Sequence, residues 1–393
     1  MEIDNTPEQP QNNMSQHTNG HTPPPLPGKD VEQTEQQAVE QPIAAVEEQI
    51  VEQPVATVEE QVTEQAPQQK NLHFESRLDL SLLQQRINEI RNEIHKVIIG
   101  QNKTIDQLLV ALLANGHILL EGVPGVAKTL SAKLLAQTIS MDFSRIQFTP
   151  DLMPSDILGT SVFNMQTSNF EFKPGPIFSN LVLIDEINRA PAKTQAALFE
   201  VMEERQITID GKTYPMSEPF LVIATQNPIE QEGTYRLPEA QLDRFLFKIS
   251  IEYPSLEEEV SILQQEHALL NKKKIDQINK ILTPAEIISF QHLIKNVVVE
   301  ANLIEYIAKI VADTRNNALL YLGASPRASI AILNAAKGFA AINNRDFVTP
   351  EDIKEAAIPV LTHRIIVSPE REMEGLTSND IIHQIVESID IPR

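Results

Sequence analysis

Cysteine is absent from the 393 residues of this chain, which excludes disulfides, thiolate metal ligands and cysteine nucleophiles together. A chain without cysteine suits a reducing compartment, so we expect a cytoplasmic protein. The sequence also lacks any apolar run of about 18 residues, and its first 30 residues contain six prolines but no apolar segment of the kind found in signal peptides. We therefore expect neither a membrane span nor a signal peptide.

Basic residues are scarce. Lys and Arg total 32 against 54 Asp and Glu, so the formal charge is −22 and the isoelectric point is about 4.8. This charge repels phosphate backbones and no local basic cluster offsets it, so nucleic acid is not an expected partner. The nine histidines show no metal-binding spacing with acidic residues, and the Gly-x-Ser-x-Gly turn of serine hydrolases is missing. Neither a zinc site nor a hydrolase triad is predicted.

The first 70 residues lack aromatic side chains and are rich in proline and glutamine. They hold 13 acidic residues against two lysines, which gives this segment half of the net charge. Such a composition cannot bury enough apolar surface to offset the entropy of ordering, so we predict a disordered acidic tail over residues 1–75. A twelve-residue unit at 40–51 recurs at 52–63 with eight identities. Two copies do not make a solenoid, and both a tether or docking arm and a low-complexity extension remain open.

The apolar pattern beyond the tail predicts an α/β domain over residues 76–254. Apolar residues recur at helical spacing over 82–94 and 108–113. Short continuous apolar runs follow, and such runs are typical of strands buried on both faces of a parallel sheet. These runs lie at 118–120, 181–184 and 220–224.

A second, all-helical domain is predicted over residues 255–393, because no strand pattern follows residue 254. Its helix starts are marked by a capping residue followed by proline at the first helical position. These starts are Thr283-Pro284, Ser325-Pro326 and Thr349-Pro350.

A glycine-bearing loop follows the first predicted strand. The strand at 117–121 leads into Gly122-Val-Pro-Gly-Val-Ala-Lys128-Thr129, and a helix continues from Leu130. Backbone N–H groups of such a loop cradle phosphates, the lysine reaches the terminal phosphates, and the threonine hydroxyl ligates Mg²⁺. The strict pattern has glycine where this chain has Ala127, the smallest possible departure. The predicted ATP-binding residues are Gly122, Val123, Pro124, Gly125, Val126, Ala127, Lys128, Thr129 and Leu130.

Two carboxylates follow the second apolar run. Asp185 and Glu186 end the strand at 181–184, at the edge where open parallel sheets bind ligands. We predict that Asp185 holds Mg²⁺ through water, together with Thr129, and that Glu186 orients and deprotonates the attacking water. The structural alternative is a solvated acidic turn. The third run leads to Asn227, which either holds the lytic water or senses the γ-phosphate, or else caps the following turn.

Together these segments resemble the AAA+ ATPases, and specifically the MoxR family. The matching stretches are EGVPGVAKT at 121–129, DEINRAP at 185–191, MEERQ at 202–206, ATQNP at 224–228, LPEAQLDRF at 237–245 and GASPR at 323–327. The resemblance extends from about residue 78 to the C-terminus, includes alanine at position 127, and leaves the acidic tail outside. It implies an α/β fold, an AAA+ αβα sandwich with a parallel sheet and an all-helical lid, that hydrolyses ATP with Mg²⁺.

By the same resemblance, three residues gain roles. Asn227 is sensor 1, Arg327 is sensor 2 and Arg244 is the arginine finger offered to the neighbouring subunit's ATP. A guanidinium stabilises charge on the γ-phosphoryl oxygens, and Arg327 is expected to reach a nucleotide bound between sheet domain and lid. Taken alone, each arginine also reads as a solvated surface cation. Because Arg244 acts only across an interface, a homo-oligomeric ring, expected to be a hexamer, is implied.

Two insertions resemble those of the MoxR branch. Residues 148–178 predict a hairpin inserted into a helix, and residues 205–212 predict a second hairpin turning at Asp210-Gly211. Such hairpins either face the pore or a partner or are purely structural. Arg189 and Arg236, the latter standing where the family pattern has proline, are expected to support assembly rather than to touch phosphate.

Three functions of different classes are consistent with the sequence. The resemblance favours an ATPase that remodels or activates a client protein, often one with a von Willebrand A domain, or assists metal insertion into it. A DNA-translocating relative is the second, disfavoured by the acidic charge. A nucleotide-gated scaffold with little turnover is the third, disfavoured because all the expected catalytic residues are present.

Overall fold

The computed structural model describes residues 78–228, 235–268 and 278–392. The predicted acidic tail at 1–75, with its two repeats, lies outside these residues. The strands are β1 (His117–Gly122), β2 (Phe143–Gln147), β3 (Gly159–Asn164), β4 (Asn169–Pro174), β5 (Leu181–Asp185), β6 (Gln206–Ile209), β7 (Lys212–Pro215), β8 (Leu221–Gln226), β9 (Phe245–Ile251), β10 (Leu320–Leu322) and β11 (Ile366–Val367).

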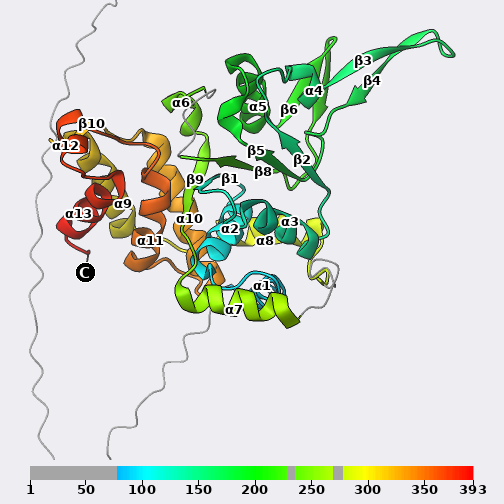
Figure 1. The fold of residues 1–393 in the computed structure, drawn as a ribbon. Coiled ribbons are helices and arrows are strands. Elements are labelled where there is room, and N and C mark those ends of the chain that lie inside the picture. Colours follow the sequence, from blue (N-terminus) through cyan, green and yellow to red (C-terminus); the bar gives the residue numbers. More distant parts are fainter. Residues whose placement is uncertain (1–77, 229–234, 269–277, 393) are drawn as a thin grey trace, which may run out of the picture. The chain divides into compact units, whose positions relative to one another are not determined.

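The helices carry their own labels in Figure 1. They are α1 (Ser81–His95), α2 (Asn102–Leu113), α3 (Lys128–Thr138), α4 (Pro154–Leu158), α5 (Ala192–Glu204), α6 (Glu239–Leu242), α7 (Leu256–Ala268), α8 (Pro284–Lys295), α9 (Ala301–Asn316), α10 (Pro326–Ile342), α11 (Pro350–Leu361), α12 (Pro369–Met373) and α13 (Ser378–Ser388), with a short 3₁₀ turn at Ile187–Arg189. None of these helices has the length and apolar composition needed to cross a bilayer.

A five-stranded parallel sheet forms the centre of the α/β domain, in the order β2-β5-β8-β1-β9. The strands therefore all end at one edge. Glu121 pairs with Gln226, and Gln147 pairs with Asp185, so the residues that follow these strands emerge side by side. This arrangement confirms the predicted parallel sheet and sets the position of the site.

Alternate residues along β1, β5 and β8 enter two different hydrophobic clusters, one on each face of the sheet. Along β5, Leu181 and Leu183 face one cluster, whereas Val182 and Ile184 face the other. The first cluster contains the apolar stripe of α1, in which Leu83, Ile87, Ile90 and Ile94 are buried. The second cluster contains the buried face of α5. Helices α1, α2 and α3 thus cover one face and α5 the other, as Figure 1 shows.

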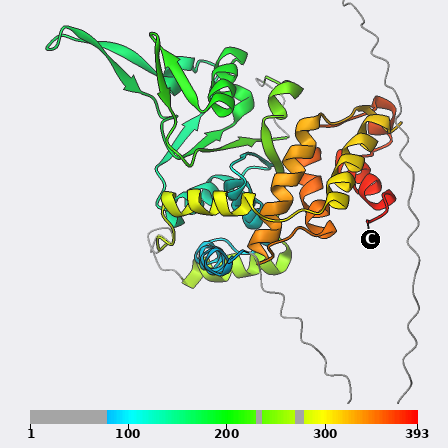
Figure 2. The same ribbon diagram turned by 180° about the vertical axis from the view of Figure 1, so that it is seen from behind.

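The region after residue 254 is helical, as predicted, and the predicted starts of α8, α10 and α11 are confirmed by their capping residues Thr283, Ser325 and Thr349. Helices α9 to α13 form one group, drawn in yellow to red in the view from behind (Figure 2), and α11 packs against β9. One feature differs from the prediction that only helices follow. Strands β10 and β11 pair as a two-stranded antiparallel ribbon, through partners such as Leu320 and Val367.

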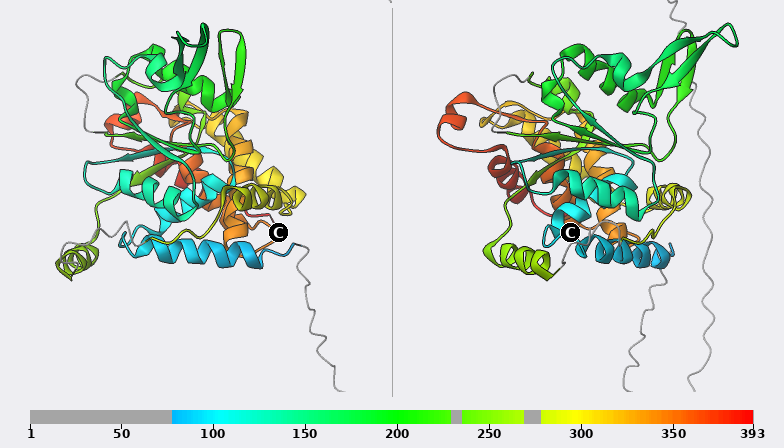
Figure 3. Two further views of the ribbon diagram at one scale, coloured as in Figure 1. Left: turned by 90° about the vertical axis from the view of Figure 1, so that its right-hand side faces the viewer. Right: turned by 45° about the vertical axis from the view of Figure 1, so that its right-hand side comes forward.

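Both predicted hairpins are present. Asp210 and Gly211 take positive φ angles between β6 and β7, as a tight turn requires. The β3–β4 hairpin extends away from the body of the domain (Figure 3). Its predicted insertion into a helix is correct only on the N-terminal side, because the five-residue α4 precedes β3 whereas residues 175–180, which follow β4, form turns.

Candidate nucleotide-binding site

The phosphate loop connects β1 to α3, which begins at Lys128, two residues before the predicted position. Gly122 closes β1, where a Cβ atom would lie 2.8 Å from the carbonyl oxygen of Ile251 on neighbouring β9, so only glycine fits. Ala127 has φ of 64° and ψ of 19°, the left-handed conformation that glycine adopts without steric cost. The structure therefore explains why the general pattern prefers glycine at this position, and alanine is the next smallest residue.

Lys128 is held over the loop by main-chain oxygens. Its Nζ donates to the carbonyl of Gly122 and to that of Gln226, the latter at 3.5 Å. These two carbonyls end β1 and β8. The ammonium group therefore lies between the phosphate loop and the strand that leads to Asn227.

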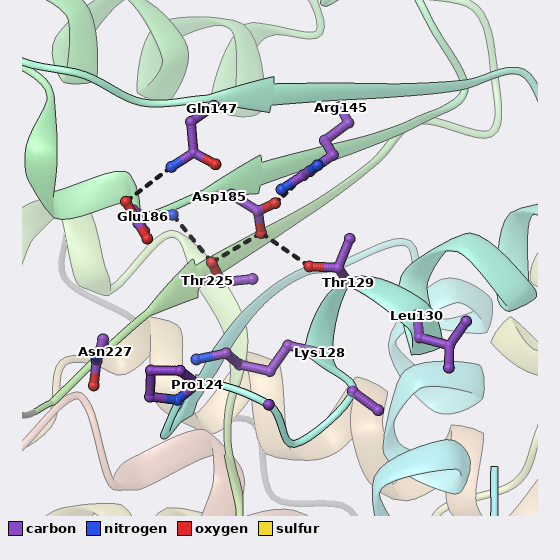
Figure 4. A pocket seen from close by; sticks show the side chains of 12 residues that line it. Pro124, Lys128, Thr129, Leu130, Arg145, Gln147, Asp185, Glu186, Thr225 and Asn227 are labelled. Atoms are coloured by element: carbon purple, nitrogen blue, oxygen red, sulfur yellow. Dashed lines mark hydrogen bonds and ion pairs between the residues drawn. The ribbon is translucent and has the colours of Figure 1, made fainter. Parts of the chain in front are cut away.

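Asp185 is buried at the end of β5 and collects two hydroxyl groups on one oxygen. Its Oδ1 accepts hydrogen bonds from Thr129 Oγ1 at 3.4 Å and from Thr225 Oγ1 at 3.2 Å. The Thr225 hydroxyl in turn accepts the backbone N–H of Glu186 at 3.0 Å. Figure 4 shows these contacts converging on the carboxylate. A hydroxyl and a carboxylate at the end of a strand are the hard oxygen ligands that suit Mg²⁺, which keeps waters and substrate phosphates as its other ligands.

Two side chains that the sequence did not single out reach the same place from β2. Arg145 Nε forms an ion pair with Asp185 Oδ2 at 2.5 Å. Gln147 Nε2 donates to Glu186 Oε2 at 2.8 Å, and Arg189 Nε pairs with the same oxygen at 2.9 Å. The sequence carried no signal for these two residues, because their role depends on the pairing of β2 with β5.

These groups line one pocket of about 350 Å³ at the carboxyl edge of the sheet (Figure 4). Nine predicted residues line it, and Gly122, Val123 and Val126 do not. The predicted lining residues are Pro124, Gly125, Ala127, Lys128, Thr129, Leu130, Asp185, Glu186 and Asn227; Arg145, Gln147 and Thr225 complete it. Loop N–H groups, one ammonium, two carboxylates and an amide therefore face a common space large enough for a polyphosphate.

Arg244 and Arg327 are brought together elsewhere. Arg327 Nη2 and Nη1 contact the two oxygens of Glu203 at 2.8 and 3.4 Å, and Arg244 Nε lies 3.7 Å from the same carboxylate. Arg244 Nη1 also donates to the carbonyl of Phe199 on α5. Glu203, at the end of α5, thus joins the two predicted transition-state arginines.

The expected placement of ATP between sheet domain and lid stays a prediction. The phosphate-loop pocket is lined by residues between 124 and 227. A second pocket is lined by residues of α2 and β9 in the sheet domain and by Ile358, Pro359, Thr362 and Asn379 of the lid. The start of α10 is anchored at the N-terminal end of β9, where Ser325 Oγ donates to Asp243. The roles of both arginines stay predictions.

Comparison with known proteins decides the family. Residues 117–247 match the profile of the ATPase family associated with various cellular activities, and residues 312–385 match the AAA lid domain. The chain is 43% identical over 310 residues to Chaperone MoxR1 of Mycobacterium tuberculosis, covering 77% of this chain and 81% of that protein. This chain belongs to the MoxR family of AAA+ ATPases.

Two further relatives and one solved structure are similar to this chain over most of their own length. The protein YeaC of Bacillus subtilis is 46% identical over 76% of this chain and 92% of its own length, and Protein MoxR of Methylorubrum extorquens is 30% identical over 76% and 93%. A candidate ATPase from Cytophaga hutchinsonii, solved as a crystal structure, superposes with a TM-score of 0.74 at 46% identity, covering 80% and 97%. The MoxR fold of this chain, a parallel AAA+ sheet followed by a helical lid, is therefore established.

Proposed function

We propose that this chain binds and hydrolyses ATP with Mg²⁺ in the pocket formed by the phosphate loop, Asp185, Glu186 and Asn227. The observation that carries the proposal is that these predicted residues, which come from distant parts of the sequence, line one pocket. Membership of an ATPase family supports the same chemistry.

Each side chain of the pocket has its own role in binding or hydrolysis. Lys128 binds the β- and γ-phosphates, and the loop N–H groups after Gly122 cradle them. Thr129 and Asp185 hold Mg²⁺, which neutralises charge that develops on the phosphates. Glu186 accepts a proton from the attacking water, while Gln147 and Arg189 both bind the Oε2 atom of its carboxylate and so orient it. Asn227 binds the water or the γ-phosphate from the end of β8.

A ring completes the site. Arg244 immediately precedes β9, whose first residue, Phe245, pairs with His117 at the start of β1, and Gly122 is at the other end of β1. At about 3.3 Å per residue, the six residues of β1 separate the arginine from its own phosphate loop by about 20 Å. Arg244, and with it Arg327, therefore serves the ATP of a neighbouring subunit. We expect a hexamer.

The work performed by the ring is the remodelling or activation of a client protein. The name Chaperone MoxR1 of the Mycobacterium relative supports this role. A client with a von Willebrand A domain is the partner we propose, and nucleotide-driven movement between subunits is the means.

Two variants separate binding from hydrolysis and identify the client. Lys128→Ala is expected to lose ATP affinity, whereas Glu186→Gln is expected to keep it and to stop turnover. Equal affinity of wild type and Lys128→Ala, measured by calorimetry, would overturn the loop assignment. Affinity capture from native lysate with ATP-loaded Glu186→Gln is then compared with Lys128→Ala by mass spectrometry.

Enrichment of one protein only in the ATP-trapped form supports client remodelling. Recovery of the same proteins with both variants would favour a scaffold whose nucleotide state does not gate a partner. DNA-linked factors, together with DNA-stimulated turnover, would favour a translocase.

A further inference from the structure

The residue before the predicted arginine finger is held by two side chains of the lid region. Asp243 Oδ1 accepts a hydrogen bond from Arg364 Nε at 2.7 Å, and Asp243 Oδ2 accepts one from Ser325 Oγ at 3.0 Å. Arg364 follows α11, and Ser325 caps α10. Both carboxylate oxygens of Asp243 are therefore occupied by lid donors.

Arg364 is a buried cation whose remaining donors all point at main chain. Its side chain is 3% exposed. The guanidinium donates to the carbonyls of Asp243 at 3.1 Å, Phe245 at 2.6 Å and Leu246 at 3.1 Å, and also to that of Val360 in α11. Burial lowers the pKa of Arg364 and the bond to Asp243 opposes that effect, so the group stays charged. One side chain thus binds the three residues 243, 245 and 246 that flank Arg244.

Glu203 provides a second connection between lid and finger. It binds Arg327 of α10 through two hydrogen bonds and lies near Arg244 on its other side. The side chains of Glu203 and Arg327 are 37% and 55% exposed, so this link is more easily broken than the buried one. The buried Arg364–Asp243 pair is therefore the firmer support.

We propose that Arg364 is a positioning residue for Arg244, so that the lid of each subunit sets the arginine finger offered to the next subunit. The inference rests on the proposed ATPase function and adds a residue outside the nucleotide pocket. A shift of the lid relative to β9 has to change the bonds of Arg364 to residues 243–246. Lid position and finger position in one subunit are thereby coupled.

The test replaces Arg364 by lysine, which keeps a positive charge but lacks the planar fork that makes several directed hydrogen bonds. Arg364→Lys is expected to keep ATP affinity within about twofold and to lower turnover by about 10- to 100-fold, the effect of a misplaced catalytic group. Full turnover in Arg364→Lys, with an active wild type, would overturn the inference and leave the proposed function intact. Absence of ATP turnover in the wild type would instead contradict the proposed function.

A double variant distinguishes positioning from general damage. If Arg364 acts only through Arg244, then Arg244→Ala/Arg364→Lys turns over ATP no more slowly than Arg244→Ala alone. A further loss of tenfold in the double variant would show that Arg364 acts by another route and would overturn the proposal.

The matched control lies in the same lid. Arg345 makes two bonds of 2.6 Å to Asp352, a carboxylate at the start of α11 that is 2% exposed. Arg345→Lys disturbs an equivalent lid ion pair without touching Asp243, so turnover within about twofold of wild type is expected. An equal loss in both lysine variants would show that lid stability alone is being measured, against the proposal. If Arg364→Lys does not fold, Asp243→Asn, of the same size, is measured against the same expectations.

Discussion

Arg244 and Gly122 lie at opposite ends of two adjacent parallel strands. Arg244 directly precedes β9, and Gly122 is the last residue of β1. Within one subunit the predicted finger cannot serve the loop that binds phosphate. The pairing of both Arg244 and Arg327 with Glu203 places the two arginines on one surface. The direction of the strands therefore supports the proposed ATP site shared by two subunits.

The Arg145 guanidinium pairs with one oxygen of Asp185, so we expect it to compete with Mg²⁺ for that carboxylate. Arg145→Ala is expected to lower the Mg²⁺ concentration for half-maximal turnover by about threefold, since a charge-assisted hydrogen bond no longer has to be replaced. Titration of Mg²⁺ at fixed ATP, with nucleotide binding followed by calorimetry, measures the shift. Lys133→Ala, which removes an exposed charge on α3 outside the pocket lining, is the control. The same shift in both variants would indicate a general charge effect.

The left-handed conformation of Ala127 has a steric cost of about 1 kcal/mol for any residue with a Cβ atom. Ala127→Gly removes that cost at the expense of a more flexible unfolded chain, so a gain of up to about 1 kcal/mol in unfolding free energy is expected. Urea unfolding of the wild type and of Ala127→Gly measures this difference in unfolding free energy. The same change at the helical position Ala132 is expected to destabilise by about 1 kcal/mol. A loss of stability in both variants would contradict the argument from φ.

His117 makes folding stability depend on pH. Burial lowers its pKa to about 3, and its ring accepts the N–H of Val222 at Nδ1 while Nε2 donates to the carbonyl of Met202. Below pH 6.5 the unfolded chain therefore binds a proton that the folded chain does not. The free energy of unfolding should fall by about 1.4 kcal/mol for each pH unit from about 6.5 towards 3.

Urea unfolding of the wild type and of His117→Gln between pH 7.5 and 5.0 measures the contribution of His117 to the pH dependence of the unfolding free energy. Glutamine keeps one donor and one acceptor but does not titrate in this range, so the variant should lose stability less steeply. The pKa of buried His363 is also well below its ordinary value, so part of the slope should remain. Equal slopes in the two proteins would contradict the assignment to His117.

The sequence allowed the phosphate loop, Asp185, Glu186 and Asn227 to be predicted because each directly follows a continuous apolar strand. The carboxyl ends of parallel strands lie at the same end of the sheet, so the residues that follow these strands lie close together. Arg145 and Gln147 were not predicted, because a short strand with partly exposed residues carries no local signature of a site. Their roles depend on β2 lying beside β5, which is a tertiary fact.

The position of Arg327 shows a second limit of sequence patterns. Its place in the first turn of α10 was predicted correctly, but which nucleotide that turn faces depends on where the lid packs. Contacts of Ser325 and Arg364 with Asp243 set where the lid packs, and they join residues 82 and 121 positions apart. The β10–β11 ribbon was missed because strands of three and two residues are too short to show a period.

Mixing two inactive variants tests the central claim most directly. Arg244→Ala has an intact pocket but no finger, and Glu186→Gln has an intact finger but no catalytic base. If ATP is hydrolysed between subunits, each variant alone turns over slowly, and the mixture regains activity because Glu186→Gln subunits supply fingers to Arg244→Ala pockets. Steady-state ATP turnover across mixing ratios should pass through a maximum near equal amounts. A mixture that shows only the sum of its two components at every ratio would contradict the shared site.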